Sequence, residues 1–126
     1  MAKDANAYLM NESSITDTTT GSWFDLHTRA PFEGLPVEIR IEGGAATSST
    51  KTLTLTIQGG TDGSSSSETL YTKAYSITTT AANNYFHEII DNFRCQYRYV
   101  RAVATFSAAI TTGTSCKLAF VTGSQL

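Results

Sequence analysis

The chain alternates hydrophobic and polar residues over several short stretches, and residues 50–58 show this pattern most clearly. Leu53, Leu55 and Ile57 alternate there with three threonines. Successive side chains leave a β-strand on opposite sides, so a period of two predicts a strand with one apolar and one polar face. No stretch competes with this pattern by showing the spacing of an amphipathic helix. The pattern therefore predicts an all-β chain.

Six further stretches show strand patterns. They are Ser22–Leu26, Val37–Glu42, Thr69–Ile77, Tyr85–Ile90, Gln96–Phe106 and Cys116–Thr122. Turn-forming residues recur about every ten residues between them, which predicts an antiparallel β-sandwich or barrel. The stretch 96–106 carries large side chains on both faces, so we expect a central strand that is covered on both sides.

The first twenty residues differ from the rest because they are polar and hold one apolar cluster, Tyr8, Leu9 and Met10. A polar terminal segment either frays or docks onto another surface. We therefore predict an extended N-terminal arm over residues 1–20 and a single β-sandwich domain over residues 21–126. A chain of 126 residues can bury about two thirds of its unfolded surface, which is enough for one core.

Charge is sparse in this chain and unevenly placed. Charged residues make up 16% of the sequence, and the net charge of −2 argues against nucleic acid as a partner. Every acidic residue lies at or before Asp91, whereas Arg94, Arg98, Arg101 and Lys117 follow it. These cations either pair with carboxylates of earlier strands or form a basic edge that faces an acidic partner.

The cysteines and histidines do not suggest a metal site. Cys95, Cys116, His27 and His87 lack the short spacing of zinc ligands. No N-terminal apolar stretch resembles a signal peptide, and no apolar run has the length of a membrane span. We therefore expect a cytoplasmic site of synthesis and free thiols, while a disulfide across two adjacent strands stays the alternative.

No arrangement of residues typical of catalysis occurs. The serines lack a Gly-x-Ser-x-Gly motif, each histidine stands alone, and Glu38 and Glu42 belong to the expected solvated face of a strand. We predict no enzyme activity, cofactor, metal or small-molecule substrate. Tyr97 and Tyr99 alternate on one face of an expected strand, so they either stack on a sugar or form cross-strand aromatic pairs.

Several segments occur in an order that is familiar from one class of viral proteins. They are Ser14–Thr16, Trp23–Leu26, Leu35–Ile41, Leu53–Gly63, Arg98–Val103 and Lys117–Val121. Together they resemble the small capsid decoration, or cement, proteins of tailed bacteriophages. The resemblance covers most of the chain and rests on strand patterns. It implies a jelly-roll-like sandwich that forms homotrimers where capsid subunits meet.

The resemblance also implies a function. The chain would be a structural virion protein, made in the host cytoplasm, that binds the major capsid protein on the capsid surface and stabilises contacts between subunits. The residues that we expect at this interface are Tyr8, Leu9, Met10, Arg94, Arg98 and Arg101. A carbohydrate-binding β-sandwich module and a phage tail or baseplate adaptor are the alternatives.

Overall fold

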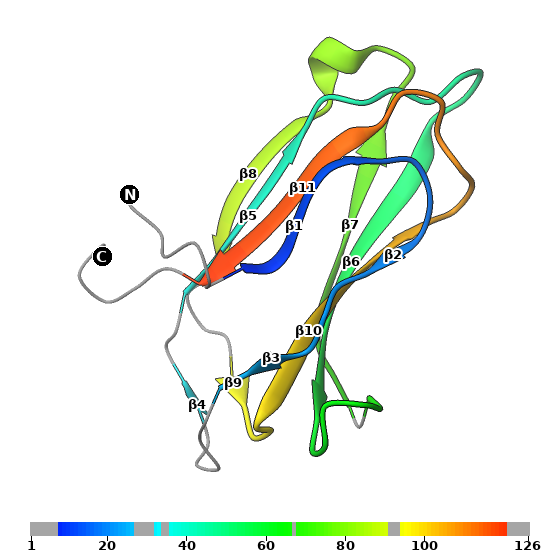
Figure 1. The fold of residues 1–126 in the computed structure, drawn as a ribbon. Coiled ribbons are helices and arrows are strands. Elements are labelled where there is room, and N and C mark those ends of the chain that lie inside the picture. Colours follow the sequence, from blue (N-terminus) through cyan, green and yellow to red (C-terminus); the bar gives the residue numbers. More distant parts are fainter. Residues whose placement is uncertain (1–7, 27–31, 34–35, 67, 91–93, 121–126) are drawn as a thin grey trace.

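The computed structural model describes residues 8–26, 32–33, 36–66, 68–90 and 94–120 (Figure 1). This part of the chain forms eleven strands and one short 3-10 helix. They are β1 (Tyr8–Ile15), β2 (Thr19–Thr20), β3 (Phe24–Asp25), β4 (Phe32–Glu33), β5 (Val37–Glu42), β6 (Lys51–Gly60), β7 (Glu68–Ile77), η1 (Ala81–Asn83), β8 (Tyr85–Ile90), β9 (Arg94–Cys95), β10 (Tyr99–Phe106) and β11 (Thr114–Phe120).

Two antiparallel sheets pack face to face, so the predicted β-sandwich is confirmed (Figure 1). Sheet A has the order β1-β11-β5-β8, and sheet B has the order β2-β10-β6-β7, with β3 also paired to β10. A short ladder joins β4 to β9.

The connectivity is that of a jelly roll. When β2 and β3 share one position and the β4–β9 ladder is left aside, eight positions remain, ordered 1-8-3-6 in sheet A and 2-7-4-5 in sheet B. The first position therefore pairs with the last, the second with the seventh, the third with the sixth and the fourth with the fifth. This is one long hairpin folded over into two Greek-key sheets.

The core lies between the sheets and uses the apolar residues of the alternating pattern. Leu53, Leu55 and Ile57 of β6 are fully buried, and so are Ile39 and Ile41 of β5. Full burial of a side chain of this size stabilises the fold by about 1.5–3 kcal/mol. The threonines between them on β6 face outward, as the pattern predicts.

The predicted arm requires correction. Residues 8–15 form β1, an edge strand of sheet A that pairs with β11, and Leu9 and Met10 are only 2% and 3% exposed. Two register irregularities, between Tyr8 and Met10 and between Glu12 and Ile15, interrupt the period of two along this strand. The alternating pattern therefore fails to predict β1, although this strand belongs to the sandwich. Residues 1–7 lie outside the described part.

The expectation for residues 96–106 is confirmed in one respect and wrong in another. The strand β10 is central in sheet B, between β6 and the short strands β2 and β3. Its inner side chains Val100, Ala102 and Ala104 are fully buried, but Arg101 and Val103 on the other face are half-exposed. No second layer in the described residues covers this outer face.

A buried asparagine connects two loops at one end of the sandwich, the upper end in Figure 1. Asn84 is fully buried, and its Nδ2 donates to the carbonyl oxygens of Gly44 (2.9 Å) and Thr78 (3.1 Å). Its Oδ1 accepts hydrogen bonds from both the backbone N–H and the hydroxyl of Thr78, each at 2.9 Å. One side chain therefore ties the β5–β6 connection to the β7–β8 connection.

We predict that Asn84→Ala lowers the free energy of unfolding by about 3 kcal/mol, because it leaves buried backbone groups without partners. Urea unfolding followed by circular dichroism measures the loss. The exposed neighbour provides a matched control, since Asn83→Ala should change stability by less than about 0.5 kcal/mol. Equal effects of the two substitutions would contradict this role of Asn84.

A polar cluster connects the two sheets at the side of the sandwich where the edge strands β7 and β8 lie. Glu88 of β8 accepts hydrogen bonds from Lys73 Nζ and from the Tyr75 hydroxyl of β7, and the Tyr75 ring lies 5.1 Å from that of Phe86. The bonds from Lys73 and then Tyr75 lower the pKa of Glu88 below its usual value of 4.5. Burial, followed by the bond to Glu88, raises the pKa of Tyr75.

This cluster should make stability depend on pH. A carboxyl with a lowered pKa in the folded state stabilises the fold above its unfolded pKa, and this contribution is lost as the pH falls through the folded value. The free energy of unfolding of wild type should therefore exceed that of Glu88→Gln by about 0.5–1 kcal/mol at pH 7, and this difference should shrink as the pH falls below 4.5. Thermal unfolding across pH 3–7 measures the difference. Lys73→Met should behave like Glu88→Gln, and a difference from wild type that stays constant between pH 7 and pH 3 would contradict the prediction.

Candidate protein-binding surface

Small side chains without charge cover the middle of the outer face of sheet B. They lie where β7, β6 and β10 run side by side, and all are half-exposed or exposed. The residues of this uncharged face are Thr52, Thr54, Thr56, Thr72, Ala74, Ser76, Val103 and Thr105. No His, Asp or Glu is among them, so no hydroxyl of the face has a base within this set to activate it.

An arginine and a tryptophan border the uncharged face. Arg101 of β10 lies opposite Gln58 of β6, and its Nε donates to Gln58 Oε1 at 2.8 Å. Its guanidinium carbon lies 4.5 Å from the centre of the Trp23 ring. Within the described residues the guanidinium thus contacts an amide oxygen and an indole ring rather than a carboxylate.

A strand glycine makes room for this pair. A Cβ atom at Gly60 would lie 2.9 Å from the Trp23 ring, which is too close for a real contact. Glycine inside a strand often marks a close approach of another group. Gly60 is therefore a sequence signal for a close contact at this position, but it does not identify Trp23 as the group in contact. Trp23 and Arg101 belong to separate segments of the sequence, and no sequence pattern pairs them.

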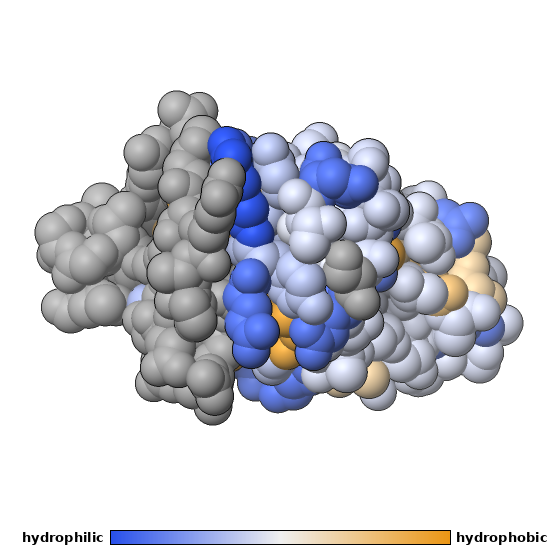
Figure 2. Space-filling view, turned by 90° about the horizontal axis from the view of Figure 1, so that it is seen from below, coloured by the Kyte–Doolittle hydropathy of each residue, from blue (hydrophilic) through white to orange (hydrophobic). Residues whose placement is uncertain are grey.

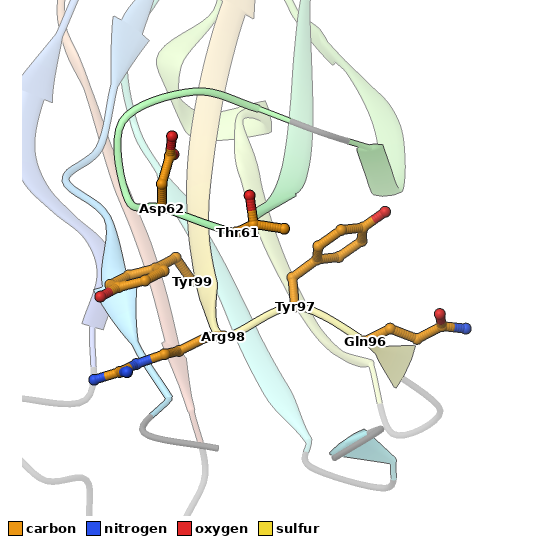
Figure 3. A pocket seen from close by; sticks show the side chains of 6 residues that line it. All are labelled: Thr61, Asp62, Gln96, Tyr97, Arg98 and Tyr99. Atoms are coloured by element: carbon orange, nitrogen blue, oxygen red, sulfur yellow. The ribbon is translucent and has the colours of Figure 1, made fainter. Parts of the chain in front are cut away.

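A pocket of about 330 Å³ lies at the end of the sandwich where β6 ends and β10 begins (Figure 3). The segment after β6 and the segment before β10 form it. Its lining residues are Thr61, Asp62, Gln96, Tyr97, Arg98 and Tyr99. Seen from this end, the described surface is mostly hydrophilic, with a small hydrophobic area between polar side chains (Figure 2).

The charged groups of the pocket are held by contacts within the chain. Arg98 makes two hydrogen bonds to Asp25, from Nε to Oδ1 at 2.8 Å and from Nη2 to Oδ2 at 2.9 Å, and this pairing raises the pKa of Arg98. Asp62 Oδ1 accepts the backbone N–H groups of Ser64 and Ser65, which lowers the pKa of Asp62. Both groups therefore keep their charge at neutral pH.

The two tyrosines do not form one flat platform for a sugar. Tyr97 lies in a bend before β10 begins at Tyr99, and the two rings point to opposite sides (Figure 3). The Tyr97 ring lies against Gly59, and its hydroxyl donates to Glu68 at 2.9 Å. The Tyr99 ring lies beside Gly63, with the Arg98 guanidinium 5.4 Å from its centre. The expectation that both share one strand face is wrong.

Tyr8, Leu9 and Met10, which we expected at an interface, do not form one exposed cluster. Leu9 and Met10 are core residues of sheet A, so this structure does not expose them as a docking cluster. Tyr8 is half-buried and lines a hollow of about 150 Å³ on the outer face of sheet A, together with Lys117. The described side-chain contacts of Arg98 and Arg101 are with Asp25, Gln58 and aromatic rings, not with these three residues.

The structure supports one of the two interpretations of the charge distribution for one arginine, and the basic edge that faces an acidic partner stays a prediction. Arg98 pairs with Asp25, an acid from an earlier strand, which confirms the intramolecular interpretation for this residue. Arg101 lies on the outer face of sheet B, close to Arg98 along the chain. Arg94 lies in β9, and its side chain is outside the described part.

Glu38 differs from its prediction as a solvated residue, because it is only 4% exposed. His87 Nε2 lies 2.6 Å from Glu38 Oε2, and Arg40 Nη2 lies 3.6 Å from the same oxygen. These contacts compensate for the burial of the carboxylate. Glu38 and His87 thus form a cross-strand pair on the outer face of sheet A, where β5 meets β8.

Cys116 is a buried free thiol, so it forms no disulfide with Cys95. Burial, and then the charge of Glu12, raises the pKa of Cys116 to about 12. Among the described residues, no three His, Cys, Asp or Glu side chains are grouped so that they could hold a metal ion. No helix in the same part of the chain has the length and apolar character needed to cross a membrane.

Comparison with known proteins gives no assignment: no protein-family model matches the chain, and no curated protein matches it significantly. A functional interpretation therefore depends on the geometry of the surfaces and on the resemblance in segment order.

Trp23 is the single tryptophan and reports on its pairing with Arg101. We predict that Arg101→Ala increases acrylamide quenching of its fluorescence, because the guanidinium no longer shields the ring, and lowers stability by about 0.5–1 kcal/mol. Lys117→Ala, on the outer face of sheet A, should leave the quenching unchanged. Quenching of Arg101→Ala at the wild-type level would show that the pair does not persist in solution.

Proposed function

We propose that this chain is a structural protein of a tailed-bacteriophage particle that binds the outside of the capsid and stabilises contacts between capsid subunits. The observation that carries the proposal is the broad uncharged face of sheet B with Trp23 and Arg101 at its border. The segment order that resembles capsid decoration proteins supports the same interpretation.

The composition of this face suits a protein interface. Charged residues are depleted from interface cores, and tryptophan and arginine are enriched among the residues that dominate binding energy, whereas serine, threonine and valine are not. Trp23 and Arg101 would therefore supply most of the binding energy, and the small side chains would supply a closely fitting surface around them. Threonine and serine lose little side-chain entropy when a partner covers them, compared with lysine or glutamate. A partner can therefore approach the sheet closely without stripping water from many charges.

Arg101 favours a partner that places an acidic group at this border of the uncharged face. Its neighbours within the described residues are Gln58 and Trp23, so an acidic group of a capsid subunit would add a charge-assisted hydrogen bond that the isolated chain does not supply. Such a bond sets register and association rate more than affinity.

Binding of this kind stabilises a shell by mass action. A protein that binds the assembled lattice more tightly than separate subunits shifts the equilibrium toward the lattice. Several copies that engage neighbouring subunits act as intramolecular links, so weak single contacts suffice.

We predict that Thr54→Glu weakens capsid binding by about tenfold or more, because it places a charge at the centre of the uncharged face and repels an acidic partner. Co-sedimentation of the purified chain with capsids that lack it measures the affinity. The control Asn11→Glu introduces the same charge at an exposed position of β1, opposite Lys117, and should bind like wild type.

Two outcomes would contradict the proposal in different ways. Failure of the wild-type chain to sediment with any capsid, or its retention on glycans instead, would overturn the proposed function. Equal binding by Thr54→Glu and Asn11→Glu would exclude the uncharged face as the contact surface.

A further inference from the structure

The strand β8 forms an open edge of sheet A. Among the strands that the structure describes, β5 is its partner, and the other side of β8 has none. Tyr85 and Ile89 are 60% and 43% exposed and are the exposed large hydrophobic residues of the described chain. Both lie on β8, on either side of His87, whose side chain is 50% exposed. An apolar stripe therefore follows this edge.

The backbone groups that face the open edge belong to the same three residues. The Gly43 N–H donates to the Asn84 carbonyl at 2.8 Å, so these two residues form a hydrogen-bonded pair at the end of the β5–β8 ladder. Hydrogen-bonded pairs alternate along an antiparallel ladder. Alternate residues of β8 from Phe86 on thus bond to β5, whereas Tyr85, His87 and Ile89 direct their N–H and C=O groups toward the open edge.

The other edges of the two sheets carry features that discourage pairing with another chain. The strand β1 has two register irregularities, β7 has one and carries Lys73, and β2 and β3 have two residues each. Irregularities, lysines and short length are the usual protections of edge strands. The strand β8 has a continuous register and neither lysine nor proline. Its one inward carboxylate, Glu88, is already bound by Lys73 and Tyr75 of the same chain.

We propose that β8 pairs with β8 of a second copy of this chain, antiparallel, across a two-fold axis at His87. Centring the axis there joins Tyr85 to Ile89 of the second copy, His87 to its equivalent, and Ile89 to Tyr85. Each pair joins residues whose backbone groups face the open edge, so each exchanges two hydrogen bonds. Shifting the strands by two residues leaves one of these residues unpaired at each end.

The side chains are complementary in this register. Tyr85 lies opposite Ile89 of the second copy on the outer face, and this happens twice because of the symmetry. An aromatic residue opposite a β-branched residue stabilises an antiparallel pair by about 0.2–1 kcal/mol. The same pairing covers part of the surface of the two exposed large hydrophobic side chains.

The charges near the axis already have partners within each chain. His87 lies 2.6 Å from Glu38 of its own chain, and Arg40 lies 3.6 Å from the same carboxylate. On the inner side, Glu88 is bound by Lys73 and Tyr75. The two-fold pair thus brings no unpaired like charges together at the axis.

The pairing extends the two copies of sheet A into one continuous sheet, and it leaves the outer face of sheet B uncovered on both copies. It predicts a two-fold dimer in place of the homotrimer that the resemblance implies. It does not depend on the proposed capsid function, because the isolated chain can form it.

Light scattering on the purified full chain tests the proposal. Wild type should have twice the mass of one chain, and Ile89→Lys should raise the dimer dissociation constant by at least about tenfold, because lysine on an edge strand opposes pairing. The matched control Thr72→Lys lies on the outer face of β7 and should leave the dimer intact. Circular dichroism should be the same for all three.

A cross-link tests the register independently. Hydrogen-bonded antiparallel pairs have Cα atoms about 5.5 Å apart, within disulfide reach, so oxidised His87→Cys should migrate as a covalent dimer. Wild type and Thr105→Cys, oxidised under the same conditions, should migrate as single chains. A monomeric or trimeric wild-type mass, a dimer that survives Ile89→Lys, or a His87→Cys variant that does not cross-link would each overturn the proposal.

Discussion

The long-range pairing of β6 with β10 is the constraint on which the rest of the structure depends. At the centre of this ladder two large side chains of β6 lie opposite small ones of β10, with Ile57 opposite Ala102 and Leu55 opposite Ala104. All four are fully buried, so the two strands fill one layer of the core without crowding. A slip by one residue would turn the threonines inward and the leucines outward. The hydrophobic effect thus fixes the register, and the register fixes every surface of sheet B.

The same register builds the candidate binding surface. Because Ile57 faces Ala102 inside, Gln58 faces Arg101 outside, and their hydrogen bond holds the guanidinium near Trp23. The uncharged face is the other side of the alternating pattern, since each buried aliphatic residue of β6 is followed by an outward polar one. The pattern that folds the chain and the surface that we propose for binding are therefore one feature, and core and surface cannot vary independently.

The sequence predicts this fold as far as the period of two is regular. Val37–Glu42 and Tyr85–Ile90 are predicted with their observed bounds because their ladders have no irregularity. The strand at Tyr8–Ile15 is mistaken for an arm because two irregularities break its alternation, and a strand of two residues such as β2 has no period to detect. The candidate site depends on contacts between distant residues, such as Trp23 with Arg101, which no local pattern contains.

The two proposed interfaces lie on opposite layers of the sandwich, which decides how they can act together. Pairing through β8 uses the edge of sheet A, so both uncharged faces of sheet B stay accessible in the dimer. A dimer with two such faces can hold two capsid subunits, and its second contact forms at a high effective concentration once the first has formed. Each face then needs only modest affinity, which agrees with a surface of small hydroxyl side chains and one arginine–tryptophan pair. In these two proposals the jelly roll separates self-association from partner binding, because its two sheets share a core and expose different surfaces.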